Sequence, residues 1–331
     1  MARIIRHRIR SFMIGLCMVT FLMVLYLGTS RNTYLGESND VKRDVLVSSL
    51  VFEELMAQPE PATPDSNILL YNGLSTCGSN GFNENLKALS KPNGFRFIRQ
   101  ESRGMKLVKK PKYYIEELYT ESSERPIAKY HDVFFLNFNS YNYSNPIYVN
   151  IAREPYNRAE ALYSYKRRLC KKEHRFCTIY SNEMLHLTFE QCLKTWKNAT
   201  YICGDFYKST MHTFCGHNKI CQDDKMPDFG VQLAKANIAR HYKFVGLYEE
   251  YRTSMIALEE IIPTYFVGTS SRYRRRNEEG VTGFPDETTE KLVKEVLKYD
   301  YEVYYFIKQR FYQTIQKLGL ESHLTDILWV H

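Results

Sequence analysis

Residues 67–82 join a short apolar run to a loop of Gly, Ser, Thr and Asn, in the sequence NILLYNGLSTCGSNGF. A strand that leads through such a loop into a helix can bind phosphate, because backbone N–H groups and the helix N-terminus face the anion. Gly78 and Ser79 allow the backbone to approach a ligand closely. However, the stretch contains no lysine or arginine and lacks the GxxxxGK[ST] pattern of a Walker loop. These residues alone fit a structural turn as well as an anion site.

A second loop with suitable chemistry follows residues 146–152, an apolar run typical of a buried strand. Arg153 stands at the carboxyl end of that run, Pro155 suits the first turn of a helix, and Arg158 lies within the same turn. A guanidinium group placed there can form two hydrogen bonds to a phosphate, and a structural salt bridge is the alternative. Because ligands of α/β sheets bind beyond the carboxyl ends of strands, the two loops together indicate a nucleotide site more specifically than either does alone.

The elements that must position these loops alternate between short apolar runs and helical patterns. This predicts an α/β fold with a central parallel sheet that is flanked by helices on both faces. Strands are expected at 68–71, 95–99, 132–138, 146–152 and 242–247. Helices are expected at about 80–90, 112–121, 154–168, 228–240 and 249–262. Beyond the N-cap Asp286, an amphipathic pattern runs to a stop at Gly319, as one helix or as two that break near residues 299–301.

The N-terminus predicts a membrane anchor. Residues 1–10 contain four arginines, and residues 11–28 contain no charged side chain. Eighteen helical residues span about 27 Å, close to one hydrocarbon core. A cleaved signal peptide has a shorter apolar core and a small-residue cleavage site, so we expect an uncleaved anchor with the arginines in the cytosol. Residues 29–66 are expected to form a stem, flexible near its end, and residues 67–331 the lumenal domain.

Cysteines, sequons and charge agree with a lumenal domain. Six of the eight cysteines lie between residues 170 and 221. In an oxidising lumen such a cluster indicates disulfides, and the CxxC spacing of a zinc knuckle does not occur. Asn142 and Asn198 each begin a glycosylation sequon. The net charge of +8 fits an anionic partner, and charge alone does not choose among glycosaminoglycan, nucleic acid and membrane.

Seven motifs, in order and at similar spacings, resemble the Golgi sulfotransferases that use 3′-phosphoadenosine 5′-phosphosulfate (PAPS). The branch is the glycosaminoglycan uronyl 2-O-sulfotransferase family, which includes uronyl 2-sulfotransferase, heparan sulfate 2-O-sulfotransferase and pipe, and the resemblance covers about residues 67–320. The motifs are LLYNGLSTCGS (69–79), HDVFFLNF (131–138), PIYVNIAREPYNR (146–158), FCGHNKIC (214–221), LAKANIARHYKFVGLYEE (233–250), IPTYFVG (262–268) and YEVYYFIKQRFYQTIQKLGL (301–320).

The resemblance implies a P-loop-like fold behind a Golgi signal anchor. The implied reaction is transfer of a sulfuryl group from PAPS, without a metal, to the 2-hydroxyl of a uronic acid. The implied partners are a sulfated or uronic-acid-containing glycan, such as heparan or dermatan sulfate or a glycoprotein glycan, and the membrane, with self-association and no nucleic acid. The family's disulfides match Cys192–Cys203 and Cys215–Cys221, and Cys170–Cys177 would be an addition.

The resemblance also shows where this chain departs from the family's site. The family uses a lysine in the first loop, a histidine before the strand that matches residues 133–138, and Arg and Ser of an R-[DE]-P-x-x-R-x-x-S pattern for the 3′-phosphate. Here Thr76 stands at the lysine position, Asp132 at the histidine position and Ala161 at the serine position. Gly73 replaces a nearby arginine. The retained residues are Gly78, Ser79, Arg153, Pro155 and Arg158.

Neighbouring residues offer compensation for these losses. His131 or Asp132 is a candidate base, and Ser164 lies one turn beyond the serine position. A cation can come from the basic residues that follow the IPTYFVG motif, namely Arg272, Arg274, Arg275 and Arg276. Two hypotheses result: an active 2-O-sulfotransferase with an altered site, or an impaired or inactive member that binds glycan or a partner enzyme in the Golgi.

Overall fold

A computed structural model of the chain describes residues 50–101, 105–172, 186–195, 209–222, 226–272 and 286–324. These residues belong to a compact unit that spans Ser48–His331. The anchor expected at residues 11–28 lies outside the described ranges, as does Asn198. Among the described helices, none combines the length and the apolar character that a membrane crossing requires.

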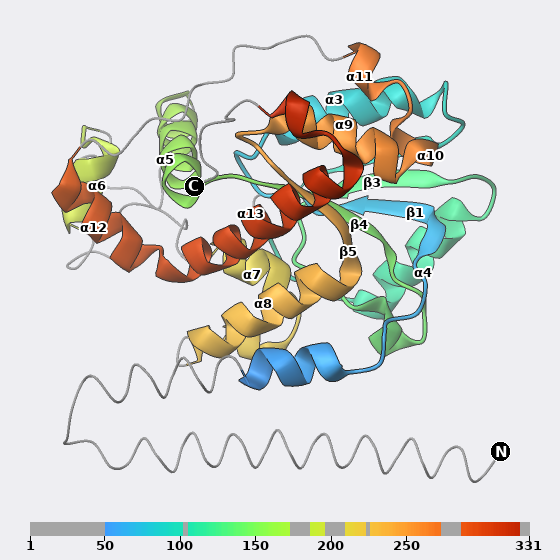
Figure 1. The fold of residues 1–331 in the computed structure, drawn as a ribbon, viewed down its shortest axis with the longest axis horizontal. Coiled ribbons are helices and arrows are strands. Elements are labelled where there is room, and N and C mark those ends of the chain that lie inside the picture. The colour runs from blue at the N-terminus through green and yellow to red at the C-terminus, as the bar shows by residue number, and fades with distance from the viewer. Residues whose placement is uncertain are drawn as a thin grey trace. The chain divides into compact units, whose positions relative to one another are not determined.

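A parallel five-stranded sheet with the order β2-β3-β1-β4-β5 forms the centre of the described fold (Figure 1). Its strands are β1 (Asp65–Tyr71), β2 (Arg96–Gln100), β3 (Ile127–His131), β4 (Pro146–Ala152) and β5 (Tyr242–Leu247). The central strand β1 aligns Ile68 with Ile127 and Tyr71 with Tyr130 of β3. The last four residues of β1 are fully buried on both faces, which explains their continuous apolar run.

Two helical layers cover the sheet. The connection from β1 to β2 runs in the opposite direction along the sheet from the connection between β2 and β3, so right-handed crossovers place α3 (Ser79–Ser90) and α4 (Pro111–Ser122) on opposite faces. The short helices α10 (Pro263–Phe266) and α11 (Thr269–Arg272) contact α3. In Figure 1 they lie with α9 (Tyr251–Ile261) above the sheet, and α4, α7 (Ser209–Cys215) and α8 (Pro227–His241) lie below it.

The C-terminal segment divides into two helices, α12 (Glu287–Val296) and α13 (Lys298–Leu318). The expected N-cap is confirmed, because the side chain of Asp286 accepts a hydrogen bond from the backbone N of Thr289 at 2.7 Å. The expected stop is also confirmed, with Gly319 at a left-handed φ of 66°. The break falls at Leu297, just before the expected range. α13 packs against β5 and α8, whereas α12 contacts α6 (Phe189–Thr195) in a second small core beside α5 (Pro155–Lys172).

One strand prediction is wrong. The apolar run 132–138 was expected to be a strand, but the strand is β3 at residues 127–131. The sequence of β3 does not show the continuous apolar run of a buried strand, because it contains Lys129. This lysine is nevertheless buried, and its ammonium group pairs with Glu121 at 3.2 Å. Residues 132–138 instead form irregular backbone with buried apolar side chains, and their N–H and C=O groups bond elsewhere, as in the 2.8 Å bond from Phe135 N to Thr213 O.

The end of the expected stem is already part of the fold. Residues 50–57 are helical, and the ring of Phe52 contacts that of Phe306 on α13 at a centroid distance of 5.8 Å. The guanidinium group of Arg240 donates to the backbone oxygens of Met56 at 3.2 Å and Gln58 at 3.0 Å. These contacts hold the chain against α8 and α13 before β1 begins.

The disulfide Cys215–Cys221 is confirmed. Cys170 and Cys192 are also disulfide-bonded. The partners expected for them, Cys177 and Cys203, lie outside the described residues, so those two pairings stay predictions. Cys77, in the loop after β1, is a free and fully buried thiol.

Candidate active site

The loop after β1 provides a backbone cradle at the carboxyl edge of the sheet. Gly78 is the N-cap of the twelve-residue helix α3 and has a left-handed φ of 81°. A side chain at Gly78 would meet the rings of Tyr248 and Tyr251 at 3.1 Å, which shows how closely the backbone is packed there. The first turn of α3 carries no acidic residue. N–H groups in such a turn and at such a helix start attract an anion.

The space around Gly73 disfavours a larger side chain. A Cβ atom at this position would lie 2.6 Å from Cζ of Tyr71 and 3.0 Å from Oγ of Ser79. The Tyr71 hydroxyl is hydrogen-bonded to the Ser79 hydroxyl at 3.1 Å, and the Tyr71 ring is fully buried. An arginine at Gly73, as in the family's loop, would therefore require the Tyr71 ring to move.

Buried polar groups fix the start of the same loop. The side chain of Asn150 on β4 donates to the backbone oxygen of Asn72 at 2.7 Å. The side chain of Asn72 lies 2.8 Å from the hydroxyl of Tyr242 on β5. All three residues are buried, and satisfied buried networks of this kind fix one conformation. The carboxyl ends of β1 and β4 are thus tied to the beginning of β5.

Thr76, which the resemblance places at the family's lysine position, bonds to the backbone of the second loop. Its hydroxyl lies 3.1 Å from the carbonyl oxygen of Arg158 and 2.6 Å from that of Ser75. Its φ is +64°, a strained conformation for a β-branched residue that costs about 1–3 kcal/mol. Contacts with α5 therefore hold this position in place, but its side chain carries no charge.

Arg153 lies directly against the cradle. Its side chain is 7% exposed, and Nη1 donates to the carbonyl oxygen of Thr76 at 3.1 Å. Its guanidinium carbon lies 4.5 Å from the centre of the Tyr248 ring, a cation–π distance. Among the described residues this guanidinium group makes one hydrogen bond and no salt bridge. Its remaining donors can therefore reach a bound phosphate.

Arg158, the second retained arginine, has a structural role. It is 1% exposed, its Nη2 atom contacts the hydroxyl of Ser209, and the same atom lies 3.7 Å from Oδ2 of Asp300. Asp300 is fully buried and accepts a 2.9 Å bond from Met211 N. Burial raises the pKa of Asp300 to about 6, against the lowering effect of the Arg158 charge. Arg158 thus takes part in a buried salt bridge that joins α5 to α7 and α13, and its binding to a cofactor stays a prediction.

Asp132, which the resemblance places at the family's histidine position, lies on the α3 side of the sheet. Its carboxylate accepts a hydrogen bond from the hydroxyl of Tyr130 on β3. The Tyr130 ring is 5.4 Å from that of Tyr71, whose hydroxyl binds Ser79 at the start of α3. Burial, followed by the hydrogen bond from Tyr130 to Asp132, raises the pKa of Tyr130. Asp132 is therefore connected to the cradle through two tyrosines.

His131 lies on the opposite side of the sheet. Its Nδ1 atom is 3.2 Å from the hydroxyl of Tyr114 on α4, as expected from the alternation of side chains along a strand. It is 4% exposed, and Nε2 has no partner among the described residues. Burial and then the charges of Lys129 and Lys106 lower its pKa to about 4, so the ring is neutral at pH 7. The structure thus separates the two candidate bases.

Two carboxylates near Arg153, those of Glu154 and Glu249, are not among the site residues predicted from the sequence. Oε1 of Glu249 accepts the backbone N of Glu154 at 2.7 Å, and Oε2 of Glu154 accepts the backbone N of Asn157 at 2.8 Å. From α13, the Tyr301 hydroxyl donates to Glu154 and the Tyr304 hydroxyl lies 3.3 Å from Glu249. Burial raises the pKa of Glu249. The amphipathic pattern that ends at Gly319 predicts a helix, but its spacing does not indicate these hydroxyl contacts.

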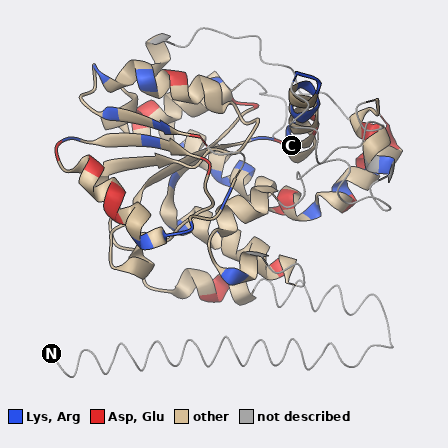
Figure 2. Cartoon of the chain, turned by 180° about the vertical axis from the view of Figure 1, so that it is seen from behind, with Lys and Arg blue, Asp and Glu red and all other residues tan. Residues whose placement is uncertain are grey.

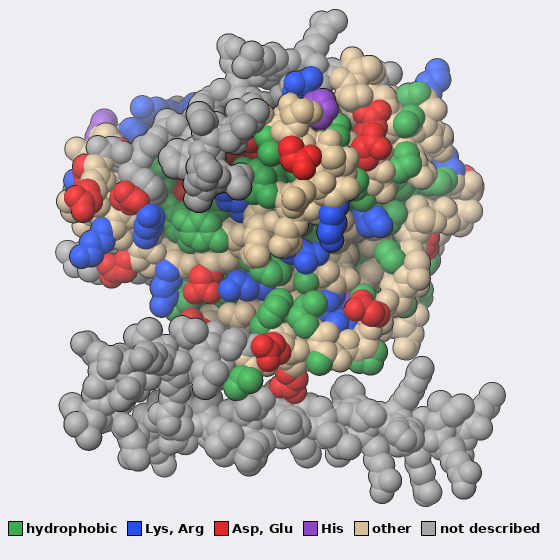
Figure 3. Space-filling model, in the orientation of Figure 1, with side chains coloured by type: hydrophobic (Ala, Val, Ile, Leu, Met, Phe, Trp, Pro, Cys, Tyr) green, Lys and Arg blue, Asp and Glu red, His purple; other side chains and the backbone are tan. Residues whose placement is uncertain are grey.

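The basic run after the IPTYFVG motif is only partly described. Arg272 is the last residue of α11, which contacts α3, whereas Arg274, Arg275 and Arg276 lie outside the described residues. Elsewhere, Figure 2 shows Lys and Arg on α5 and spread over several other elements. On the face in Figure 3, basic and acidic side chains alternate over the described elements. The described part of the site therefore offers one available guanidinium group, that of Arg153.

Comparison with known proteins gives relatives along most of the chain, although no family model matches. Human uronyl 2-sulfotransferase is 25% identical over an alignment of 346 positions, gaps included, that covers 97% of this chain and 81% of the relative. Heparan sulfate 2-O-sulfotransferase hst-2 of Caenorhabditis elegans is 25% identical over 82% of this chain and 87% of the relative. The Drosophila melanogaster uronyl 2-sulfotransferase homolog pip is 25% identical over 74% of this chain and 52% of the relative. These relatives support a divergent member of the uronyl and heparan sulfate 2-O-sulfotransferase family.

Proposed function

We propose that this protein is a PAPS-dependent sulfotransferase that acts on the 2-hydroxyl of a uronic acid in a glycosaminoglycan or glycoprotein glycan. The observation that carries the proposal is Arg153, bonded to the carbonyl of Thr76 beside the N-terminus of α3. The relatives are named as 2-O-sulfotransferases, and the site shares the edge of the sheet where ligands of α/β folds bind.

The residues present fit an anionic nucleotide. The backbone of the loop and the first turn of α3 would hold one phosphate group, and Arg153 would hold another. PAPS supplies the sulfuryl group that is transferred. Glu154 and Glu249 are bonded to backbone N–H groups and tyrosine hydroxyls, so their charges are offset by donors rather than directed at the anion.

Asp132 is the better placed of the two candidate bases. It is linked to the cradle through Tyr130 and Tyr71, whereas His131 contacts Tyr114 on the other face. A carboxylate near a sulfuryl donor and a uronic acid is electrostatically unfavourable. We therefore expect slow turnover, because a general base contributes about 10²–10⁴ and one preorganised stabiliser about 10²–10³ in rate.

The location that we propose is the Golgi membrane, with residues 11–28 as a single anchor and the described domain in the lumen. The apolar segment behind four arginines and the disulfide Cys215–Cys221 support this orientation. A tagged full-length chain tests it, since protease added to sealed Golgi vesicles should spare the domain and remove only a cytosolic N-terminal tag.

Nucleotide binding is the decisive test of the function. We expect calorimetry with 3′-phosphoadenosine 5′-phosphate to detect binding to the wild-type protein, and Arg153→Ala to weaken it at least about tenfold, in line with a charge-assisted bond of about 1.5–3 kcal/mol. Arg125→Ala is the matched control, because Arg125 is exposed and precedes β3 at the other edge of the sheet. Equal binding by the wild type and Arg153→Ala would contradict the proposed site.

A second function, that of an impaired member which binds glycan or a partner enzyme, is favoured by two observations. The loop has no cation of its own, and Arg158 is engaged with Asp300. Transfer of labelled sulfate to heparan, chondroitin or dermatan acceptors separates the two functions. Turnover that Arg153→Ala abolishes would exclude the impaired member, and nucleotide binding without turnover would support it.

A further inference from the structure

A polar pocket lies at the amino edge of the sheet, remote in the fold from the candidate active site. Its volume is about 500 Å³, within the usual range of about 300–1,000 Å³ for small-molecule sites. Three segments line it, residues 58–62, 137–144 and 240–241. These segments lie shortly before β1, β4 and β5, whereas the phosphate cradle follows β1.

The walls of this pocket are formed mainly by amides, hydroxyls and prolines, with one arginine and one glutamate. The guanidinium group of Arg240 donates to backbone oxygens of Met56 and Gln58, and these bonds hold it in the wall. Oδ1 of Asn137 accepts bonds from Asn139 N and from Asn145 Nδ2, both at 3.1 Å. Amides, hydroxyls and proline faces suit a neutral sugar, whereas an anion would require cationic side chains that are free to bind it.

His241 also contributes a neutral surface. Burial and then the charge of Arg240 lower its pKa to about 4, so its ring carries no charge at lumenal pH. The ring lies against that of Phe135 at 5.2 Å, and Nδ1 is 3.2 Å from Nδ2 of Asn145. The one acidic residue of the lining, Glu60, is exposed.

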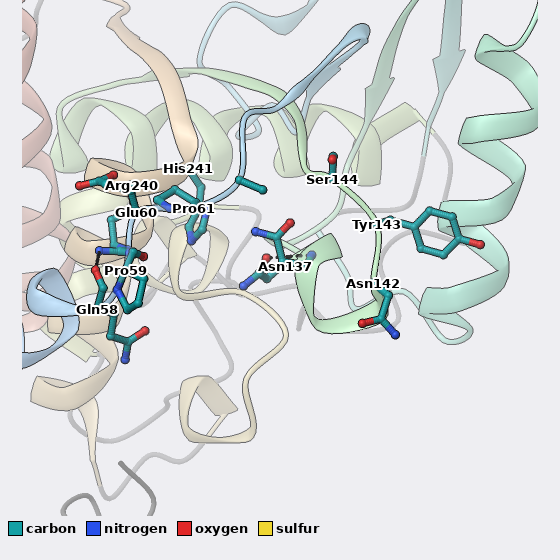
Figure 4. Close-up of a pocket in the computed structure, with 12 residues that line it drawn as sticks. Gln58, Pro59, Glu60, Pro61, Asn137, Asn142, Tyr143, Ser144, Arg240 and His241 are labelled. Atoms are coloured by element: carbon teal, nitrogen blue, oxygen red, sulfur yellow. Dashed lines mark hydrogen bonds between the residues drawn. The ribbon is translucent and has the colours of Figure 1, made fainter. Parts of the chain in front are cut away.

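Asn142 stands at the rim of the pocket. Figure 4 shows Asn142 on one side, Gln58 and Pro59 on the other, and Asn137 between them. Asn142 is exposed and has a left-handed φ of 64° at the end of the short helix η1 (Phe138–Tyr141). Among the described residues its side-chain amide makes no hydrogen bond, so it is available for modification. It begins the sequon Asn142-Tyr143-Ser144.

We propose that Asn142 carries an N-linked glycan whose first N-acetylglucosamine residues lie in this pocket, with the prolines and amides of residues 58–62 and 137–139 as their seat. The proposal rests on the lumenal location proposed above. Nδ2 of Asn142 forms a bond to the anomeric carbon of an oligosaccharide and loses one proton. The bond from that carbon to a lipid diphosphate carrier breaks, the carrier leaves with the electron pair, and no redox partner is needed.

Attachment is tested with the full chain produced in a eukaryotic secretory host. Asn142→Asp retains a residue that tolerates the left-handed backbone, and Ser144→Ala removes the sequon while the backbone carbonyl bonded by Tyr119 stays. Both variants should lose the mass of one glycan. An unchanged mass in both would overturn the proposal if Asn198 is glycosylated, and glycan on neither site would instead contradict the lumenal location.

Seating in the pocket is tested by the rate at which a peptide N-glycosidase releases the Asn142 glycan. We expect release from the native protein to be about tenfold or more slower than from denatured protein, as for a group that reacts only after local opening. Asn139→Arg, which places a long side chain in the pocket, should keep the glycan and speed its native release. Equal rates of glycan release from native and denatured wild-type protein would contradict the proposed contact between the glycan and the pocket.

Discussion

The two edges of the sheet use the same residue type for different purposes. At the carboxyl edge, Arg153 has one carbonyl partner and Arg158 is paired with a buried carboxylate. At the amino edge, Arg240 is engaged by backbone oxygens of residues 56, 58 and 59. An arginine can therefore bind a ligand only when some of its N–H donors are not already hydrogen-bonded within the fold. Of these three, Arg153 best meets that condition.

The edges also differ in how they are held together. Little more than one turn of α13 holds the carboxyl edge together, because Asp300 pairs with Arg158 on α5 and Tyr301 and Tyr304 contact the loops after β4 and β5. The amino edge is joined by amide and carbonyl bonds around Asn145 and Arg240. Changes at the carboxyl edge should therefore affect stability and ligand binding together, whereas changes at the rim of the amino edge should affect neither strongly.

The largest effect is expected for Asp300→Ala. This change leaves the buried guanidinium group of Arg158 without its carboxylate, which typically costs about 3–5 kcal/mol in the free energy of unfolding. Urea denaturation followed by circular dichroism measures the loss. Glu60→Ala is the matched change at the amino edge, where an exposed side chain should alter stability by less than about 0.5 kcal/mol. Similar losses in both variants would remove the distinction between the edges.

The next largest effect concerns catalysis at the carboxyl edge. Thr76→Lys combined with Asp132→His should raise sulfate transfer by about 10²-fold or more, because it restores a cation and a neutral base. Lysine is not β-branched, so the left-handed backbone at residue 76 strains it less than threonine. Thr76→Met with Asp132→His controls for side-chain length. No gain in a folded, nucleotide-binding double variant would refute both assignments.

A smaller effect distinguishes the edges by pH. His131 and His241 have folded pKa values lowered to about 4 from 6.5, so the unfolded chain binds more protons between these values and stability rises with pH. Asp300 has a folded pKa raised to about 6 from 3.8, so the folded chain binds more protons between these values. Its contribution to the free energy of unfolding is therefore lost as pH rises from about 4 to 6. Each of these three groups changes the slope of the free energy of unfolding against pH by up to about 1.4 kcal/mol per pH unit.

Variants separate these slopes in urea titrations between pH 4 and 7. His131→Gln and His241→Gln should each flatten the rise in stability, one at each edge. Asp300→Asn should make the rise steeper, because it removes the only one of the three groups that opposes it. A slope that His241→Gln leaves unchanged would show that this ring titrates normally.

The sequence predicted the parts of the fold that local patterns determine. The predictions of the caps Asp286 and Gly319 and of the mostly apolar strand β4 were correct, because propensity and burial agree there. β3 was missed, since its Lys129 is buried through a partner on α4 that no local pattern identifies. The separation of His131 from Asp132 follows from the strand alternation of β3, and the burial of Arg158 depends on Asp300, 142 residues further on. Contacts of that kind arise only from the tertiary structure.

The smallest expected effect tests whether α13 prepares the anion site. Tyr301→Phe removes the hydroxyl that donates to Glu154, at a cost of about 1 kcal/mol for one hydrogen bond. With one donor fewer, the carboxylate beside Arg153 repels an incoming phosphate more strongly, so the affinity for 3′-phosphoadenosine 5′-phosphate should fall about threefold to tenfold. Tyr305→Phe is the control, because Tyr305 lies on the same helix and is 53% exposed. If both variants bind the nucleotide as tightly as the wild type, α13 supports the fold of the carboxyl edge without tuning its charge.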